Sequence, residues 1–125
     1  MALIAVIEHD LQRLASLCDV LLAAGHGVVT FEHAEELLRH EGAVEVDLII
    51  MDLALSGAKG LAIARRVREL EPFDIPMIAV SDAPFPQQMA ARSDLFRDTI
   101  SRPFDAPALL ESVAHALATQ KMDAG

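Results

Sequence analysis

The chain has 125 residues, 53% of them hydrophobic, which suits one core-rich domain that buries roughly two-thirds of its unfolded surface. Its formal net charge of −9 argues against nucleic acid or an anionic membrane as a direct partner, and a lone Cys18 excludes a disulfide framework or a cysteine metal site. No apolar run approaches the ~20 residues of a membrane-spanning helix, and the N-terminus lacks the basic start of a signal peptide, so we expect a cytoplasmic protein.

Short apolar runs alternate with segments of helical periodicity along the chain. In chain order we expect a strand at 3–7, a helix at 11–24, a strand at 27–31, a helix at 34–40, a strand at 46–51, a helix at 61–70, a strand at 76–80, a helix at 87–93, a strand at 99–101 and a helix at 106–119. The apolar face of the first helix comprises Leu14, Leu17, Cys18, Leu21 and Leu22. Gly25 suits the end of this helix, and Asp105 suits the N-cap of the last one.

This alternation predicts an α/β fold, a doubly wound five-stranded parallel sheet with helices on both faces and the common strand order 2-1-3-4-5. The run 48–51 is apolar without alternation, as in a strand that is covered on both faces, and Asp52 follows it directly. Functional crevices in such sheets lie at the carboxyl ends of the strands. Because strands one and three would be neighbours, we expect Glu8, His9 and Asp52 to share one crevice. Ser81 ends another apolar run at the same edge.

Five segments of the chain, taken in order, resemble the receiver domain of two-component response regulators. They are Glu8-His9-Asp10 after an apolar strand, Asp52 after 48–51, Gly60 at the start of a helix, Ser81 after 78–80, and Arg102-Pro103-Phe104. No single segment is specific, but five in this order at nearly the right spacing are typical of the family. The resemblance covers essentially the whole chain and implies a CheY-like fold over 1–120, with a flexible tail at 121–125.

The resemblance also implies a function. A histidine kinase or phosphotransfer protein would place a phosphoryl group on Asp52, which Ser81 and Arg102 would contact. The change would be passed to an effector through the face of the fourth and fifth helices. The domain would be a signalling module and not an independent enzyme.

A metal ion, Mg²⁺, is implied as well. Its ligands would come from Glu8, His9, Asp52 and the backbone carbonyl of Ala54. Mg²⁺ prefers hard oxygen ligands in octahedral geometry.

Three positions depart from the family pattern. His9 replaces an acid that normally binds the metal, and histidine suits softer ions, so we expect weak Mg²⁺ binding or replacement by Mn²⁺. Arg102 replaces the lysine of the family pattern; it keeps the positive charge, but its planar guanidinium differs in shape from an ammonium group. Thr99 stands where the family usually has an aromatic switch residue. These departures support an alternative, a phosphorylation-independent pseudo-receiver that acts as a protein interaction module.

Simpler interpretations of these residues, and other classes of protein, also have to be considered. Asp52 could be an ordinary turn residue, and Glu8 a solvated strand end. A P-loop is not supported, since Ser56-Gly57-Ala58-Lys59-Gly60 does not fit its pattern. A flavin phosphate site is not supported either, because the loop after the first strand is acidic.

Overall fold

The computed structural model describes residues 2–33, 36, 46–53, 62, 64–66, 68–69, 75–82 and 95–124, with side chains as far as 118. The elements are β1 (Leu3–Ile7), α1 (Leu11–Ala23), β2 (Gly27–Phe31), β3 (Leu48–Asp52), β4 (Met77–Ser81), β5 (Asp98–Ser101) and α5 (Ala106–Ala124). The expected helices at 34–40, 61–70 and 87–93 lie wholly or largely outside the described residues, as do Ala54 and Gly60.

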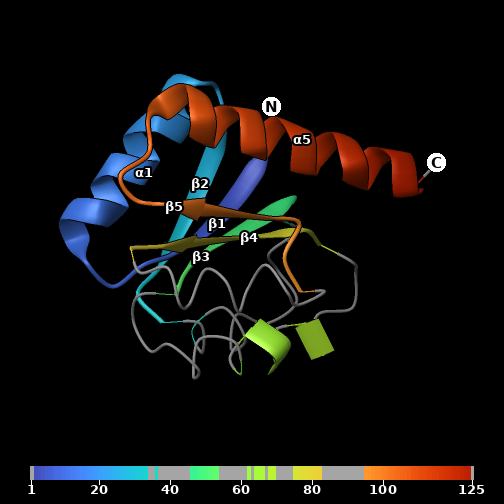
Figure 1. The fold of residues 1–125 in the computed structure, drawn as a ribbon, viewed down its shortest axis with the longest axis horizontal. Helices are drawn as coiled ribbons and strands as arrows, with labels where there is room; N and C mark the ends of the chain where they lie inside the picture. The colour runs from blue at the N-terminus through green and yellow to red at the C-terminus, as the bar shows by residue number, and fades with distance from the viewer. Residues whose placement is uncertain are drawn as a thin grey trace.

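The five strands form one parallel sheet in the order β2-β1-β3-β4-β5, so the predicted order 2-1-3-4-5 is confirmed. The most apolar strands, β3 and β4, are buried along their whole length. Figure 1 shows α1 and α5 together over one face of this sheet and the helical segment around 64–66 on the other. Coverage of both faces explains why the central strands show no polar alternation.

Two apolar clusters lie on the two faces of the sheet, because successive strand residues point to opposite sides. The cluster beneath α1 and α5 comprises Ala2, Ile4, Val6, Leu17, Leu21, Leu48, Ile50, Ile78, Val80, Ile100, Leu109, Val113 and Ala116. The cluster on the other face comprises Ala5, Ile7, Phe31, Val46, Ile49, Met51, Ala64, Ile75 and Met77. Burial of these side chains fixes the register of the strands, and with it the positions of the polar residues at their ends.

The first helix begins and ends as its sequence predicts. The Asp10 carboxylate caps it by accepting hydrogen bonds from the backbone N–H groups of Gln12 and Arg13 at 3.0 and 3.1 Å. At its C-terminus, the backbone N–H groups of residues 25 and 26 donate to the carbonyls of residues 22 and 21, respectively. Gly25 has a φ of +91°. One prediction about this helix is wrong: Leu22 is 55% exposed, because the buried stripe runs through Leu17 and Leu21.

Several element boundaries differ from the predicted ones by one or two residues. Asp52 is the last residue of β3 and Ser81 the last of β4, so both belong to their strands. The largest difference is at α5, which continues to Ala124 through residues that we expected to form a tail. No glycine or proline occurs between Pro107 and Gly125, so the sequence contains no strong helix breaker there. In the part of the chain that is described, no helix has both the length and the apolar character to cross a bilayer.

Candidate functional site

The carboxyl ends of four strands bring a polar group together at one edge of the sheet. Glu8 follows β1, Asp52 ends β3, Ser81 ends β4 and Arg102 follows β5. The register sets these ends side by side, with partners Ile7 and Met51, Asp52 and Val80, and Ser81 and Ser101. Glu8 and Asp52, which the sequence predicts to be neighbours at the ends of strands one and three, therefore lie at the same edge of the sheet, and two further strands contribute polar residues there.

Three of these side chains are buried although they are polar. Glu8 is 0% exposed, Asp52 is 2% exposed and Ser81 is 1% exposed. Buried polar groups are retained where they have hydrogen-bond partners, and an isolated buried carboxylate is strongly disfavoured. Glu8 and Asp52 are therefore neither a solvated strand end nor an ordinary exposed turn residue.

Arg102 supplies the positive charge at the centre of the site. Its Nη2 donates to Oε2 of Glu8 at 2.9 Å and to Oδ2 of Asp52 at 3.0 Å. Its Nη1 donates to Oδ1 of Asp82 at 3.0 Å. The backbone N–H of Arg102 donates to the carbonyl of Ser81 at 2.9 Å, and the Arg102–Pro103 peptide is cis. One guanidinium thus bridges carboxylates from three strand ends, a geometry that a lysine ammonium could not reproduce.

The proximity of two buried carboxylates changes the protonation of Glu8. Burial, a hydrogen bond with Asp52 and the charge of Asp52 together raise the pKa of Glu8 to about 7. The backbone N–H of Asp10 and the charge of Arg102 act in the opposite direction. Near neutral pH, Glu8 is therefore partly protonated, and its proton can lie in the hydrogen bond with Asp52. The pKa of Arg102 is raised, since its bonds to Asp52 and Asp82 outweigh burial.

His9 lies at the rim of the site. Its side chain is 46% exposed, and its Nδ1 lies 3.4 Å from Oε1 of Glu8. That Glu8 oxygen also accepts the backbone N–H of Asp10 at 2.9 Å. The Asp10 carboxylate is committed to capping α1 and does not enter the site. Ala54, expected to provide a carbonyl ligand, lies outside the described residues.

The side chains present fit a divalent metal ion. Oε2 of Glu8 and Oδ2 of Asp52 converge on one positively charged nitrogen, so two buried carboxylate oxygens already face a common cation. Carboxylate oxygens are the ligands that Mg²⁺ and Mn²⁺ prefer. The metal would compete with the Arg102 guanidinium for these oxygens, and the neighbouring His9 nitrogen would favour the softer of the two ions.

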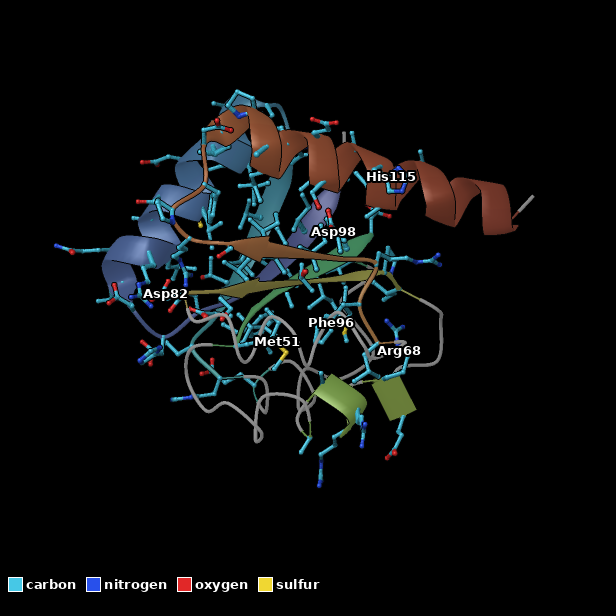
Figure 2. The ribbon with its side chains drawn as sticks, viewed as in Figure 1. Met51, Arg68, Asp82, Phe96, Asp98 and His115 are labelled. Atoms are coloured by element: carbon cyan, nitrogen blue, oxygen red, sulfur yellow. The ribbon has the colours of Figure 1, made fainter. Side chains whose placement is uncertain are left out.

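Two further charged residues join the site: Asp82, which follows Ser81 at the end of an apolar run and is expected at this edge, and Arg13, which the sequence did not identify as a member. Nη2 of Arg13 lies 2.6 Å from Oδ2 of Asp82, and its Nη1 lies 3.9 Å from Oδ2 of Asp52. Figure 2 shows Asp82 at the carboxyl edge of the sheet, beside α1. The signal was present in the sequence: Arg13 lies in the first turn of a helix that begins at this edge, and Asp82 directly follows β4.

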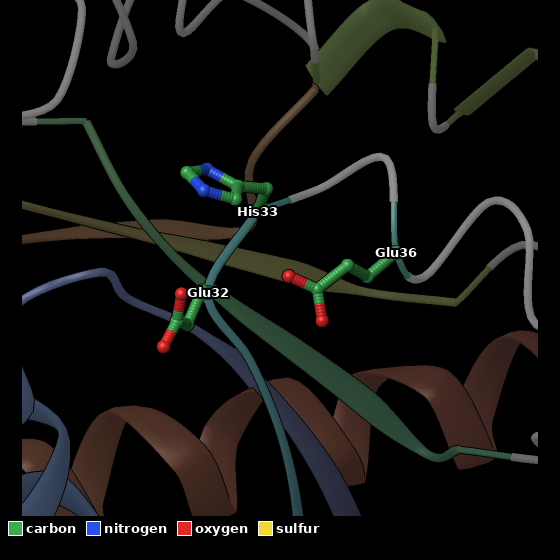
Figure 3. A group of neighbouring side chains, drawn as sticks. All are labelled: Glu32, His33 and Glu36. Atoms are coloured by element: carbon green, nitrogen blue, oxygen red, sulfur yellow. The ribbon is translucent and has the colours of Figure 1, made fainter.

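A separate group of possible metal ligands follows β2 and consists of Glu32, His33 and Glu36, whose ligand atoms lie within 4.8 Å of one another. Figure 3 shows the three side chains projecting from one short segment. Glu32 and His33 are exposed and Glu36 is half-buried, and acidic groups often cluster in this way on surfaces without an ion. Their proximity alone does not identify a site.

Residues 4–114 of the chain match the family described as the response regulator receiver domain. The chain belongs to this family. It is 32% identical over 112 residues to the C4-dicarboxylate transport transcriptional regulatory protein DctD of Rhizobium meliloti, covering 89% of this chain and 24% of that protein. It is 29% identical over 113 residues to the CAI-1 autoinducer sensor kinase/phosphatase CqsS of Vibrio cholerae, covering 87% of this chain and 16% of that protein. The receiver domain thus spans a quarter or less of the length of these curated relatives.

Solved structures support the same fold for this receiver domain. NtrX from Brucella abortus superimposes with a TM-score of 0.85 at 24% identity, covering 98% of this chain and 27% of that one. A response regulator from Thermotoga maritima superimposes with a TM-score of 0.81 at 21% identity, covering 94% of this chain and 98% of that one. The predicted receiver fold is confirmed. Receiver domains are signalling domains of two-component systems and not enzymes in the ordinary sense.

Proposed function

We propose that this receiver domain accepts a phosphoryl group on Asp52 from a histidine kinase or phosphotransfer protein. The observation that carries the proposal is the environment of Asp52, a buried carboxylate at the end of a central strand that is bonded by the Arg102 guanidinium and adjoins Glu8. A carboxylate held in this way is a competent nucleophile whose charge is already partly balanced.

In this phosphoryl transfer, the bonds and electron pairs balance without a further reactant. An oxygen of Asp52 forms a new P–O bond with its own electron pair, and the bond between phosphorus and the donor's histidine nitrogen breaks, leaving its electron pair on the imidazole. Charge on the transferring group must be neutralised throughout the reaction. Arg102 and the hydroxyl of Ser81 are the groups that we assign to the phosphoryl oxygens. Ser81 ends β4, the strand next to that of Asp52, and Arg102 follows β5, one strand further along, with its guanidinium bonded to Asp52.

Glu8 and Asp52 are the residues that would hold Mg²⁺ or Mn²⁺, with His9 and the Ala54 carbonyl as the further positions that the family pattern indicates. The bound ion would supply additional positive charge to the phosphoryl oxygens. Glu8 has to lose its proton before it can act as a ligand, and its pKa near 7 makes this possible at neutral pH. Arg102 would then turn from the carboxylates toward the phosphoryl group.

We assign the output of the domain to the face of the fourth and fifth helices. The charge added at Asp52 would bias the packing of this face and alter its contact with an effector protein or domain. Thr99 lies half-buried in β5, where it lacks the bulk of an aromatic switch residue. The output would therefore depend more on charge at the sheet edge than on the rotation of a large side chain.

The test is phosphorylation by acetyl phosphate, followed by intact mass. Wild-type protein with Mg²⁺ or Mn²⁺ is expected to gain one phosphoryl group, which is released by hydroxylamine as an acyl phosphate should be. Asp52→Asn has nearly the same shape and should gain nothing. Asp82→Asn removes a neighbouring carboxylate and should retain the gain. A folded wild-type protein that gains no mass with either ion would refute the proposal and leave the phosphorylation-independent interaction module.

A further inference from the structure

Arg13 and Asp82 form an ion pair beside the buried carboxylates, and neither takes part in the function proposed above. The two oxygens of Asp82 are divided between two arginines: Oδ2 lies 2.6 Å from Nη2 of Arg13, and Oδ1 lies 3.0 Å from Nη1 of Arg102. Asp82 therefore holds both guanidinium groups at once. Each of these arginines also reaches Oδ2 of Asp52, at 3.9 Å from Arg13 and 3.0 Å from Arg102.

The charges at this edge are close to balance only while Asp52 carries no phosphoryl group. The site holds the carboxylates of Glu8, Asp52 and Asp82 against the two guanidinium groups. A phosphoryl group on Asp52 adds about one further negative charge and three acceptor oxygens. Among the described residues, Arg13 is a cation with a weak contact to Asp52, and its 3.9 Å separation is beyond a hydrogen bond but short enough for a phosphoryl oxygen to close.

The side chain of Arg13 also has room to move. Its exposed fraction is 36%, compared with 15% for Arg102. It lines an open hollow of about 460 Å³ together with Ser16, Leu17, Asp82, Arg102, Pro103 and Phe104. A long side chain beside an open hollow can turn from one partner to another without any change in the backbone of α1.

We propose that Arg13 is a second phosphoryl-binding residue, which Asp82 holds beside Asp52 until the phosphoryl group arrives. This inference rests on the proposed function, because it needs a phosphoryl group on Asp52. Asp82 then slows phosphorylation of Asp52 in two ways. It occupies the arginines before transfer, and its own charge repels the incoming group. Arg13 and Asp82 therefore act in opposite directions on the reaction.

The test compares initial rates of phosphorylation by acetyl phosphate. Arg13→Gln is expected to slow the reaction by about tenfold, the factor that one charge-assisted hydrogen bond represents. Arg13→Lys should recover part of the rate, since it restores the charge without the second nitrogen. Asp82→Asn should accelerate it by about threefold. In the double variant, most of this acceleration should disappear, because the arginine that Asp82 releases is absent.

The matched control is Arg66→Gln, which changes an exposed helical arginine on the opposite face of the sheet and should keep the wild-type rate. Wild-type rates for Arg13→Gln would overturn this inference while leaving the proposed function intact. A wild-type protein that is not phosphorylated would overturn both. Asp82→Asn examines the same contact from the other side, so if Arg13→Gln failed to fold, a rate for Asp82→Asn at or below the wild-type rate would still refute the proposal.

Discussion

Nη2 of Arg102 donates to Oδ2 of Asp52 at 3.0 Å, and this bond joins the strand ends of β3 and β5 across the intervening β4. The same nitrogen reaches Glu8 at 2.9 Å. The carboxylates are almost fully buried, and Arg102 is 15% exposed, so little solvent screens the interaction. In the resting domain, Arg102 therefore has the role of the main counter-charge for both carboxylates.

Loss of this counter-charge should destabilise the fold. Arg102→Met is expected to lower the free energy of unfolding at pH 7 by about 2–4 kcal/mol, because it leaves two buried carboxylates without their shared counter-charge. Arg102→Lys should lie between wild type and Arg102→Met, since an ammonium keeps the charge but lacks the second nitrogen with which Arg102 reaches Asp82. Urea denaturation measures the difference, with Arg66→Met as the exposed control. Equal stability of Arg102→Met and this control would contradict the role of Arg102.

Glu8 should make the stability depend on pH in a defined direction. Its pKa rises from 4.5 to about 7 on folding, so the folded state binds the proton more tightly than the unfolded chain does. The stabilisation from this proton is complete below pH 4.5 and is lost as the pH rises through 7. Relative to Glu8→Gln, wild type should lose on the order of 2–3 kcal/mol between about pH 5 and pH 8. Parallel profiles for the two proteins, measured by urea denaturation in the absence of divalent ions, would be inconsistent with a buried, proton-sharing Glu8.

Much of the fold followed from the apolar pattern. The strand boundaries were predicted to within two residues, because continuous apolar runs such as 48–51 are stable only where both faces are covered. The strand order followed from the alternation of strands and helices. Details set by tertiary packing were not predictable: Leu22 has the spacing of a core residue, yet lies outside the buried stripe of α1. The end of α5 was predicted too early, at 119, although no strong stop signal precedes Gly125 and the sequence there permits a longer helix.

The position of the site could be predicted from the sequence, but the hydrogen bonds and ion pairs within it could not. The placement of Glu8, Asp52 and Ser81 at the carboxyl edge follows from the strand pattern alone, since parallel strands end together. The pairing of Arg13 with Asp82 depends on the rotation of α1 and on side-chain rotamers, and neither is encoded in residue spacing. The raised pKa of Glu8 depends on burial and on its distance from Asp52, which only the packed structure provides.

The opposite edge of the sheet offers a stability test that should leave the site unaffected. Ser112 on α5 donates its hydroxyl to Oδ2 of Asp98 on β5 at 2.6 Å, and Figure 2 shows Asp98 far from Asp82 along the sheet. Ser112→Ala should lower the free energy of unfolding by about 1–2 kcal/mol, because it removes a bond to a charged acceptor at a largely buried position. Ser16→Ala, which removes an exposed bond within α1, should cost less than about 0.5 kcal/mol. Thermal or urea unfolding compares the two, and an equal effect would show that the link between α5 and β5 contributes little.

His9 should govern the choice of metal ion. Its nitrogen lies 3.4 Å from a Glu8 oxygen, at the position where the family has an acidic ligand. His9→Asp replaces a borderline nitrogen with a hard carboxylate, so Mg²⁺ affinity is expected to rise by about tenfold while the preference for Mn²⁺ falls. Calorimetric titration with each ion measures both quantities. His9→Asn retains a similar size without the charge and should bind Mg²⁺ no better than wild type does. The same titrations in an Asp52→Ala background should lose most of the binding. An Mg²⁺ affinity that is the same for His9→Asp and wild type would place His9 outside the metal site, and the weak or altered metal use expected from the sequence would then need another cause.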